Sequence, residues 1–403
     1  MQASIVPAQR ALEFGIYRDG DNNLDASQNE VVEQALDVSA KDPGIGFAVE
    51  DTTRADRALR TLDFDLIDGQ VDHAHVGAPH DMAAPSNLAA FVARTLDEAQ
   101  KSGSKQTWID LVDHGAGDGG GLEADSTHHV MPMPKIAQAI ADGVALHAKE
   151  HPDDAGRRVD GVVANQCLMA SLGFADALSS AGVKYLAASP ETMLSPGTPS
   201  TIAEAIAAHE NDPAAMAKAA VANVMHTRYR DGVGDSFGPA AAFDVLDLDP
   251  GKIATMRGAV KTFNDTAAAV AARDTGTRAA LRDDVASVDG MVRFPGSKGL
   301  PWHADRPAIA TYDAVARDCR LDAGLRAKAT AAGKAVGDLV LAHGESRRFD
   351  PFGGASYADA AGPTVHLPTR KDQVDPWAPS ISETRNAFYA ATDAAALTDA
   401  LTA

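Results

Sequence analysis

The sequence predicts an α/β fold with a mostly parallel central sheet, plus a helix-rich C-terminal part. Three observations support this fold class. Short apolar segments alternate with helical ones, two of the apolar segments end abruptly at a reactive residue, and the pattern changes near residue 249. Alternation of strands and helices favours parallel strands, because right-handed helical crossovers return the chain to the same edge of the sheet.

Several segments have the apolar, β-branched composition of strands. They are 11–17, 46–50, 183–188 and 240–246, together with the two runs that end at His114 and Cys167. Segment 62–76 alternates between apolar and acidic residues, which is typical of an edge strand or a hairpin. Periodic apolar stripes predict the helices, which cover 28–39, 86–100, 135–150, 168–180 and 203–230. Ser86 and Asn87 have the side chains of an N-terminal helix cap.

The stretch Asp249-Pro-Gly251 predicts a boundary in the chain, because proline and glycine interrupt regular structure. It separates a first domain, 1–249, from a helix-rich region, 250–403, that packs on that domain or extends it. In the second region we expect long alanine-rich helices over 253–273 and 326–343, and one last strand over 364–367.

The composition favours a large hydrophobic core and an acidic surface. The chain has 403 residues, of which 45% are hydrophobic, and its formal net charge is -20. Such a charge disfavours nucleic acid and anionic membrane as partners and favours cationic peptides. The two cysteines, Cys167 and Cys319, are expected to be free, and Cys319 lies on a helical pattern with Val315, as a core residue would.

The first ten residues lack the basic start and apolar run of a secretory signal peptide. No stretch reaches the roughly 18 uncharged apolar residues that span a bilayer. We therefore expect a protein that does not insert in a membrane and is either cytoplasmic or exported by a non-classical route.

His114 and Cys167 are the candidate catalytic pair. Each follows a predicted parallel strand, and the loops at the carboxyl ends of such strands line the crevice above the sheet. A histidine beside a cysteine provides a general base and a nucleophile. The backbone N–H groups of Gly115 and Cys167 can form an oxyanion hole. The alternative is a buried strand cysteine and a hydrogen-bonded loop histidine without catalytic roles.

Four motifs in the same order resemble the clostripain family of cysteine peptidases. They are RDGDNNL at 18–24, DHGAG at 113–117, NQCLMAS at 165–171, and LAASPE at 186–191 followed by Pro196-Gly197. The resemblance implies a caspase-like αβα sandwich and hydrolysis of peptide bonds through a thioester. It implies His114 and Cys167 as the catalytic dyad, Gly115 beside the oxyanion site, a peptide or protein substrate, and no required cofactor.

The predicted substrate pocket departs from the family pattern. Clostripain-like enzymes usually carry aspartate two residues before the catalytic cysteine, where this chain has Asn165. The family's Ser-Glu pair is split by a proline, as Ser189 and Glu191. An amide is a much weaker partner for a guanidinium than a carboxylate is, so the family's preference for Arg or Lys before the cleaved bond is expected to be altered.

Asp19 and Asp21 begin an alternating series of oxygen ligands, which resembles the start of a calcium loop. An EF-hand loop needs glycine at its sixth position, where this chain has Leu24. A turn that precedes the next helix explains the same residues. Some clostripain-like enzymes depend on calcium, which keeps a weak calcium site among the expectations.

Three functions remain open at this stage. The first is a cysteine endopeptidase, and the second is a caspase-like binding or regulatory module without catalysis. The third is a metal-dependent hydrolase that uses Asp110, Asp113 and His114. Within the first, Asp113 either orients the imidazole of His114 or caps the loop.

Overall fold

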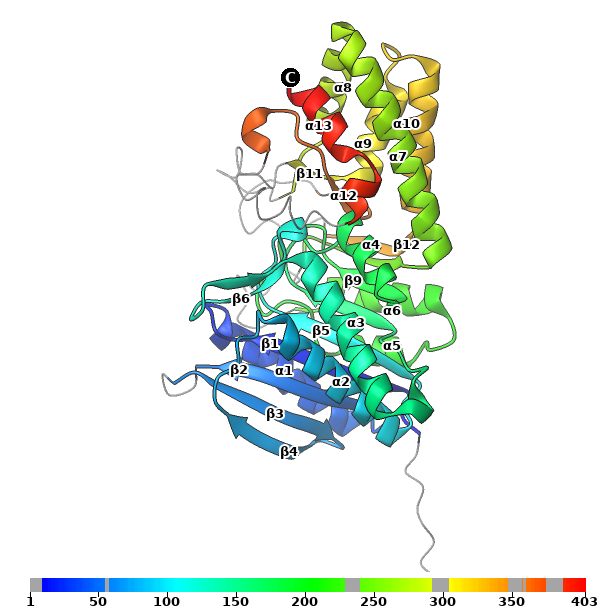
Figure 1. Cartoon of the computed structure of the whole chain (residues 1–403). Coiled ribbons are helices and arrows are strands. Elements are labelled where there is room, and N and C mark those ends of the chain that lie inside the picture. Colours follow the sequence, from blue (N-terminus) through cyan, green and yellow to red (C-terminus); the bar gives the residue numbers. More distant parts are fainter. Residues whose placement is uncertain are drawn as a thin grey trace, which may run out of the picture.

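The computed structural model describes residues 9–54, 58–228, 240–291, 304–346, 357, 360–374 and 387–403. Its centre is a nine-stranded sheet in the lower half of Figure 1. In spatial order the strands are β12 (Val340–Glu345), β10 (Ala242–Asp247), β9 (Tyr185–Ala188), β8 (Gly161–Asn165), β5 (Gln106–Val112), β1 (Leu12–Asp19), β2 (Ile45–Thr53), β3 (Arg60–Ile67) and β4 (Gln70–Gly77). The five from β9 to β2 are parallel, and the two pairs at each edge are antiparallel.

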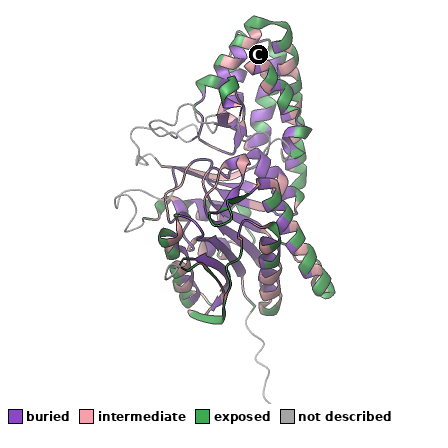
Figure 2. Cartoon of the chain, turned by 60° about the vertical axis from the view of Figure 1, so that its left-hand side comes forward, coloured by how far each residue is buried: buried purple, intermediate pink, exposed green. Residues whose placement is uncertain are grey.

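Helices cover both faces of this sheet. Successive side chains of a strand point to opposite faces, so they pack alternately against the two helix layers. On one face lie α2 (Pro85–Ser102), α3 (Met133–Glu150) and α4 (Leu172–Ser180); on the other lie α1 (Asp25–Lys41), α5 (Ile202–Ala207) and α6 (Pro213–His226). In β5, Ile109 and Leu111 pack into the first layer, whereas Trp108 and Val112 pack into the second. Figure 2 shows buried strands between helices whose outer sides are exposed. The predicted αβα sandwich is confirmed.

The C-terminal helices form the upper half of Figure 1. They are α7 (Pro250–Arg273), α8 (Thr275–Ser287), α9 (Ala308–Arg317), α10 (Ala323–Gly337), α12 (Ala387–Ala391) and α13 (Ala394–Thr402). Phe263 of α7 and Tyr312 of α9 belong to the same hydrophobic cluster as Ile109 of the sheet. The residues after 249 therefore share one continuous core with the sandwich.

The predicted helix over 326–343 is wrong in its second half. Helix α10 ends at Gly337, and β12 follows as an edge strand paired with β10. A short apolar run such as Val340-Leu-Ala carries no periodicity that separates a strand from a helix end. The predicted strand over 364–367 exists as β13 (Thr364–His366), but it pairs with β11 (Asp305–Pro307) in a separate small sheet.

Other helix ends also differ from the prediction. Helix α2 begins at Pro85 with Ala84 before it, so Ser86 and Asn87 are not its caps. The predicted helix over 203–230 is two helices, α5 and α6, because Pro213 lacks a backbone N–H and starts a new helix. Residues 229–230 lie outside the described residues.

Cys319 is exposed after the end of α9 and does not lie in the core, and both cysteines are free.

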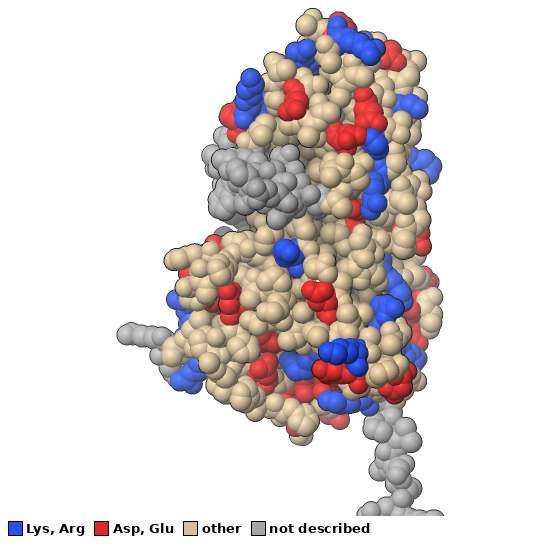
Figure 3. Space-filling view, viewed as in Figure 1, with Lys and Arg blue, Asp and Glu red and all other residues tan. Residues whose placement is uncertain are grey.

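Among the described residues, no helix combines the length and apolar character needed to cross a membrane. Basic side chains are interspersed among acidic ones over the face shown in Figure 3.

Candidate active site

His114 and Cys167 lie at equivalent positions just beyond the ends of two neighbouring strands. In the parallel pair β5 and β8, Val112 is opposite Asn165. The pairing continues for one more residue, since the N–H of Asp113 donates to the carbonyl oxygen of Asn165 at 3.4 Å. His114 and Cys167 each follow two residues after that opposed pair. The sheet register therefore brings the two candidate residues together.

The loops that carry the two residues pack directly against each other at Gly115. A Cβ atom at position 115 would overlap the carbonyl oxygen of Cys167 and lie 2.8 Å from the Cβ of Gln166. The side-chain amide of Gln166 also donates to the carbonyl oxygen of His114 at 3.0 Å. Only glycine permits this approach, which places the backbone of Gly115 beside that of Cys167.

The chain turns sharply after β8, and the thiol of Cys167 faces the turn at 189–193. Leu168 has a φ of 69°, a left-handed conformation that is uncommon and strained for leucine. Helix α4 starts only at Leu172, with Ser171 as its cap, so the predicted start at 168 is corrected. The N–H of Met193 donates to Cys167 Sγ at 3.2 Å.

Burial raises the pKa of the Cys167 thiol to about 11. The negative charge of Glu191 acts in the same direction, and the hydrogen bond from Met193 opposes both. In this conformation the thiol is therefore protonated at neutral pH.

The imidazole of His114 is held by Asn23, a residue whose role the sequence did not reveal. His114 Nε2 lies 2.6 Å from Asn23 Oδ1. Because an amide oxygen only accepts hydrogen bonds, this contact places the proton on Nε2 and leaves Nδ1 as the basic nitrogen. The signal in the sequence is the polar DNN run directly after β1, which reaches the same edge of the sheet as His114.

Asp113 caps the loop and does not contact the imidazole. Its Oδ1 accepts from the backbone N–H of His114 and from the amide of Asn22, both at 2.5 Å, and its Oδ2 accepts from the N–H of Glu123. Burial, together with the nearby charge of Asp19, raises the pKa of Asp113 well above its usual range. Asp110 is fully buried within β5. The set Asp110, Asp113 and His114 therefore does not fit a hydrolytic metal site.

Asp19 and Asp21 organise loops instead of presenting a set of open oxygen ligands. Asp19 is buried, and its Oδ1 accepts from the N–H of Asp21 at 2.9 Å. Asp21 pairs with Arg54 at 2.5 Å through Oδ1 and accepts from both the N–H and the hydroxyl of Ser126 through Oδ2. Calcium at these carboxylates would have to displace the Arg54 guanidinium from Asp21. A calcium site at Asp19 and Asp21 stays a prediction.

Asn165 is a buried clamp on the neighbouring loop. Its Nδ2 donates to the carbonyl oxygen of Thr198 at 3.0 Å, and its Oδ1 accepts from the N–H of Thr198 at 2.6 Å. Gly197 has a φ of 94°, and a Cβ there would overlap Asn165 Oδ1. The amide thus holds the loop through both of its polar atoms.

Ser189 and Glu191 lie in a fully buried turn beside Cys167. The Ser189 hydroxyl accepts from the N–H of Glu191 at 3.1 Å and donates to its carbonyl oxygen at 2.8 Å. The turn is joined to the segment after the cysteine, since the N–H of Leu168 donates to the carbonyl oxygen of Glu191 at 3.1 Å. A pocket function for the two side chains stays a prediction.

Comparison with solved structures identifies the fold, whereas the sequence matches none of the family models or curated proteins compared with it. An inactive zymogen C11 protease from Parabacteroides distasonis aligns at a TM-score of 0.63 and 14% identity, covering 96% of this chain and 99% of that one. The secreted C11 cysteine protease iotapain from Bacteroides thetaiotaomicron aligns at 0.62 and 16%, covering 96% and 100%. A secreted C11 cysteine protease from the same organism, in complex with an irreversible peptide inhibitor, aligns at 0.63 and 12%, covering 95% and 99%.

The chain has the fold of the C11, or clostripain-like, cysteine proteases. The resemblance predicted from the four motifs is thereby confirmed at the level of the fold. At 12–16% identity, the roles of single residues rest on the geometry described above.

In this C11 fold the C-terminal region contacts the loops that follow both candidate residues, His114 and Cys167. Asp118, in the loop after His114, accepts from the hydroxyls of Ser171 at 2.8 Å and of Tyr389 in α12. The N–H of Thr364 donates to the carbonyl oxygen of Ala170 at 2.8 Å. The residues after 249 thus support the turn that carries Cys167.

We expect Asn165→Asp to destabilise the C11 fold. A carboxylate cannot donate to the carbonyl oxygen of Thr198, and leaving a buried polar atom unpaired costs about 1–3 kcal/mol. The measurement is chemical denaturation at pH 7.5, with Asn211→Asp on the exposed surface as the matched control. Equal stability of the two variants would show that the clamp contributes nothing.

We expect Glu191→Gln to lower the pKa of Cys167, because the charge of Glu191 raises it. The measurement is the rate of alkylation by iodoacetamide as a function of pH. It is made in a Cys319→Ala background, so that Cys167 is the only thiol. The midpoint should move to lower pH, whereas the exposed control Glu150→Gln should leave it unchanged. An unmoved midpoint in Glu191→Gln would contradict the assigned interaction.

Proposed function

We propose that this protein is a cysteine endopeptidase that hydrolyses peptide bonds through a His114–Cys167 dyad and a thioester intermediate. The observation that supports the proposal most strongly is the sheet register, which puts a histidine and a cysteine at equivalent ends of β5 and β8. One neighbour of the same fold binds a peptide inhibitor, which favours a peptide substrate here as well.

The reaction follows from the atoms available. Cys167 gives its thiol proton to His114 Nδ1 and attacks the carbonyl carbon of the scissile bond. The N–H groups of Gly115 and Cys167 stabilise the oxyanion that forms. Imidazolium then protonates the leaving amine, and a thioester remains. Water, deprotonated by His114, attacks the thioester to release the carboxylic acid and restore the thiol.

Burial raises the pKa of Cys167 to about 11, so its thiol loses a proton only with difficulty. The thiolate therefore forms only as His114 takes up the proton and becomes a cation beside it. Asn23 contributes by holding the proton on Nε2, so that Nδ1 is free to accept. This role makes Asn23 a positioning residue.

The substrate preference is proposed to differ from Arg or Lys. The amide of Asn165 carries no charge, and the backbone of Thr198 already occupies both of its polar atoms. It therefore offers no ion pair to a basic side chain.

A requirement for calcium stays a prediction; it is tested by adding EDTA to the cleavage assay.

We expect the purified protein to cleave members of a fluorogenic peptide library varied at the residue before the scissile bond. Cys167→Ala removes the nucleophile and should abolish cleavage, with Cys319→Ala as the control that keeps activity. Loss in Cys167→Ala alone supports the peptidase. Cleavage that survives in Cys167→Ala would overturn it, and the absence of cleavage by every form, with and without calcium, would favour a non-catalytic module.

The same assay measures the contribution of Asn23. Asn23→Ala should lower kcat roughly 10- to 100-fold with little change in KM, since small misplacement of a catalytic group costs rates of this order. Asn23→Asp keeps an oxygen acceptor and should restore most of kcat. A kcat that is equal in Asn23→Ala and the wild type would show that Asn23 does not position the imidazole.

A further inference from the structure

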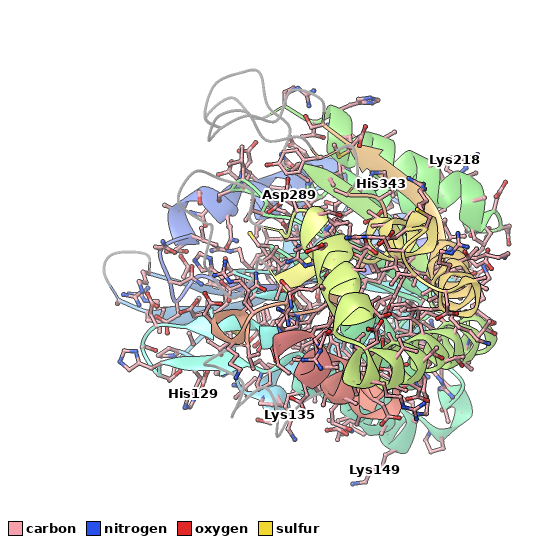
Figure 4. The ribbon with its side chains drawn as sticks, turned by 90° about the horizontal axis from the view of Figure 1, so that it is seen from above. His129, Lys135, Lys149, Lys218, Asp289 and His343 are labelled. Carbon is pink, nitrogen blue, oxygen red and sulfur yellow. The ribbon has the colours of Figure 1, made fainter. Side chains whose placement is uncertain are left out.

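Asp97, His147 and His151 form a cluster of side chains far from Cys167, near the amino-terminal ends of the central strands. Asp97 is near the end of α2, and His147 and His151 are at the end of α3. These helices lead into the starting ends of β5 and β8, whereas the dyad follows the finishing ends of the same strands. Lys149, between the two histidines in sequence, is labelled at the rim of the molecule in Figure 4.

The three side chains converge on a common point. His147 Nδ1 lies 2.6 Å and His151 Nε2 lies 3.2 Å from Asp97 Oδ1. Each of the three residues offers one possible ligand atom, and these atoms all lie within 4.8 Å of one another. His147 is fully buried, while Asp97 and His151 are partly exposed, so solvent reaches one side of the cluster.

We propose that Asp97, His147 and His151 form a binding site for a divalent transition-metal ion of the zinc class. Two histidines four residues apart at a helix end present their rings on one side of the helix. Imidazole nitrogen and carboxylate oxygen are ligands that such ions favour. Tetrahedral coordination at about 2.0–2.1 Å would separate the ligand atoms by about 3.3 Å. The 3.2 Å between His151 and Asp97 is close to this value, whereas the 2.6 Å between His147 and Asp97 would lengthen when the ion binds.

Asp154 supplies the outer contact that metal-bound histidines usually make. Its Oδ2 lies 3.3 Å from His147 Nε2 and accepts from Arg157 Nε at 2.5 Å. In this structure His147 Nδ1 shares a proton with Asp97 Oδ1 at 2.6 Å. The ion would replace that proton, while Asp154 keeps a proton on Nε2. This contact is independent of the three ligands and points to the same nitrogen.

The ion would connect α2, α3 and the connector that follows α3. Three protein ligands leave a fourth position, which solvent fills on the exposed side. Because His114 and Cys167 lie at the carboxyl ends of the same strands, the ion would stabilise the fold without taking part in a reaction at Cys167. Binding should weaken on acidification, because the histidines must be deprotonated to act as ligands.

The test is titration of the tag-free full-length chain with Zn²⁺ by calorimetry after chelator treatment. Co²⁺ absorption reports the coordination geometry independently of catalysis. The wild type should bind one equivalent and show a higher Tm with Zn²⁺ than with EDTA. His151→Gln and Asp97→Asn should each weaken binding at least roughly tenfold, and Asp154→Asn should weaken it 10- to 100-fold, as lost outer contacts do.

His226→Gln, which changes an exposed histidine at the end of α6, is the matched control and should bind as the wild type does. Circular dichroism establishes that each variant is folded; His151 is partly exposed, so its replacement leaves the core intact. No zinc binding by the wild type would overturn the proposal. Binding of equal strength in His151→Gln and Asp97→Asn would also overturn it, because the ion would then lie elsewhere.

Discussion

The hydrogen-bonded register between β5 and β8 is the constraint on which the site depends. At the start of the pair, Gly161 is opposite Trp108, and a Cβ on the glycine would overlap the indole ring. This contact disfavours any bulkier residue at that point. A shift of one residue would turn the side chains of one strand to the other face of the sheet relative to its neighbour, because side chains alternate along a strand. Close packing at the beginning of the strands therefore helps to fix the register that places His114 and Cys167 after neighbouring strand ends.

Burial makes negative charge costly near those strand ends, for carboxyl groups as well as for the thiol of Cys167. Burial raises the pKa of Asp113 and of Asp110 well above the usual range, and that of Asp19 to about 7. Groups that prefer to stay neutral indicate surroundings in which an isolated negative charge is poorly solvated. A thiolate in such surroundings needs a cation in contact with it. In the proposed reaction, the imidazolium of His114 would be that cation, and it would form only as the thiol proton moves.

The sequence was sufficient for the fold, because the fold follows from local patterns, and the same patterns place His114 and Cys167 after neighbouring strands. Apolar runs buried on two faces predict the inner strands, and each run stops where a polar, reactive residue reaches the edge of the sheet. The contacts of Asn23 with His114 and of Asn165 with Thr198 join loops far apart in sequence, so no local pattern reveals them. The sequence predicts a helix where β12 lies, because the alanine-rich pattern of α10 does not indicate where the helix ends. The cluster at His147 required the packing of two helices.

The C-terminal region has a physical reason to remain attached to the sandwich. One carboxyl group, Asp118, accepts hydrogen bonds from Ser171, which caps the helix after Cys167, and from Tyr389 near the end of the chain. Thr364 holds the carbonyl oxygen of Ala170 in the same turn. The strained conformation of Leu168 persists only if surrounding contacts outweigh its cost. Because some of these contacts come from beyond residue 249, the geometry of the turn that carries Cys167 depends on the whole chain and not on the sheet alone.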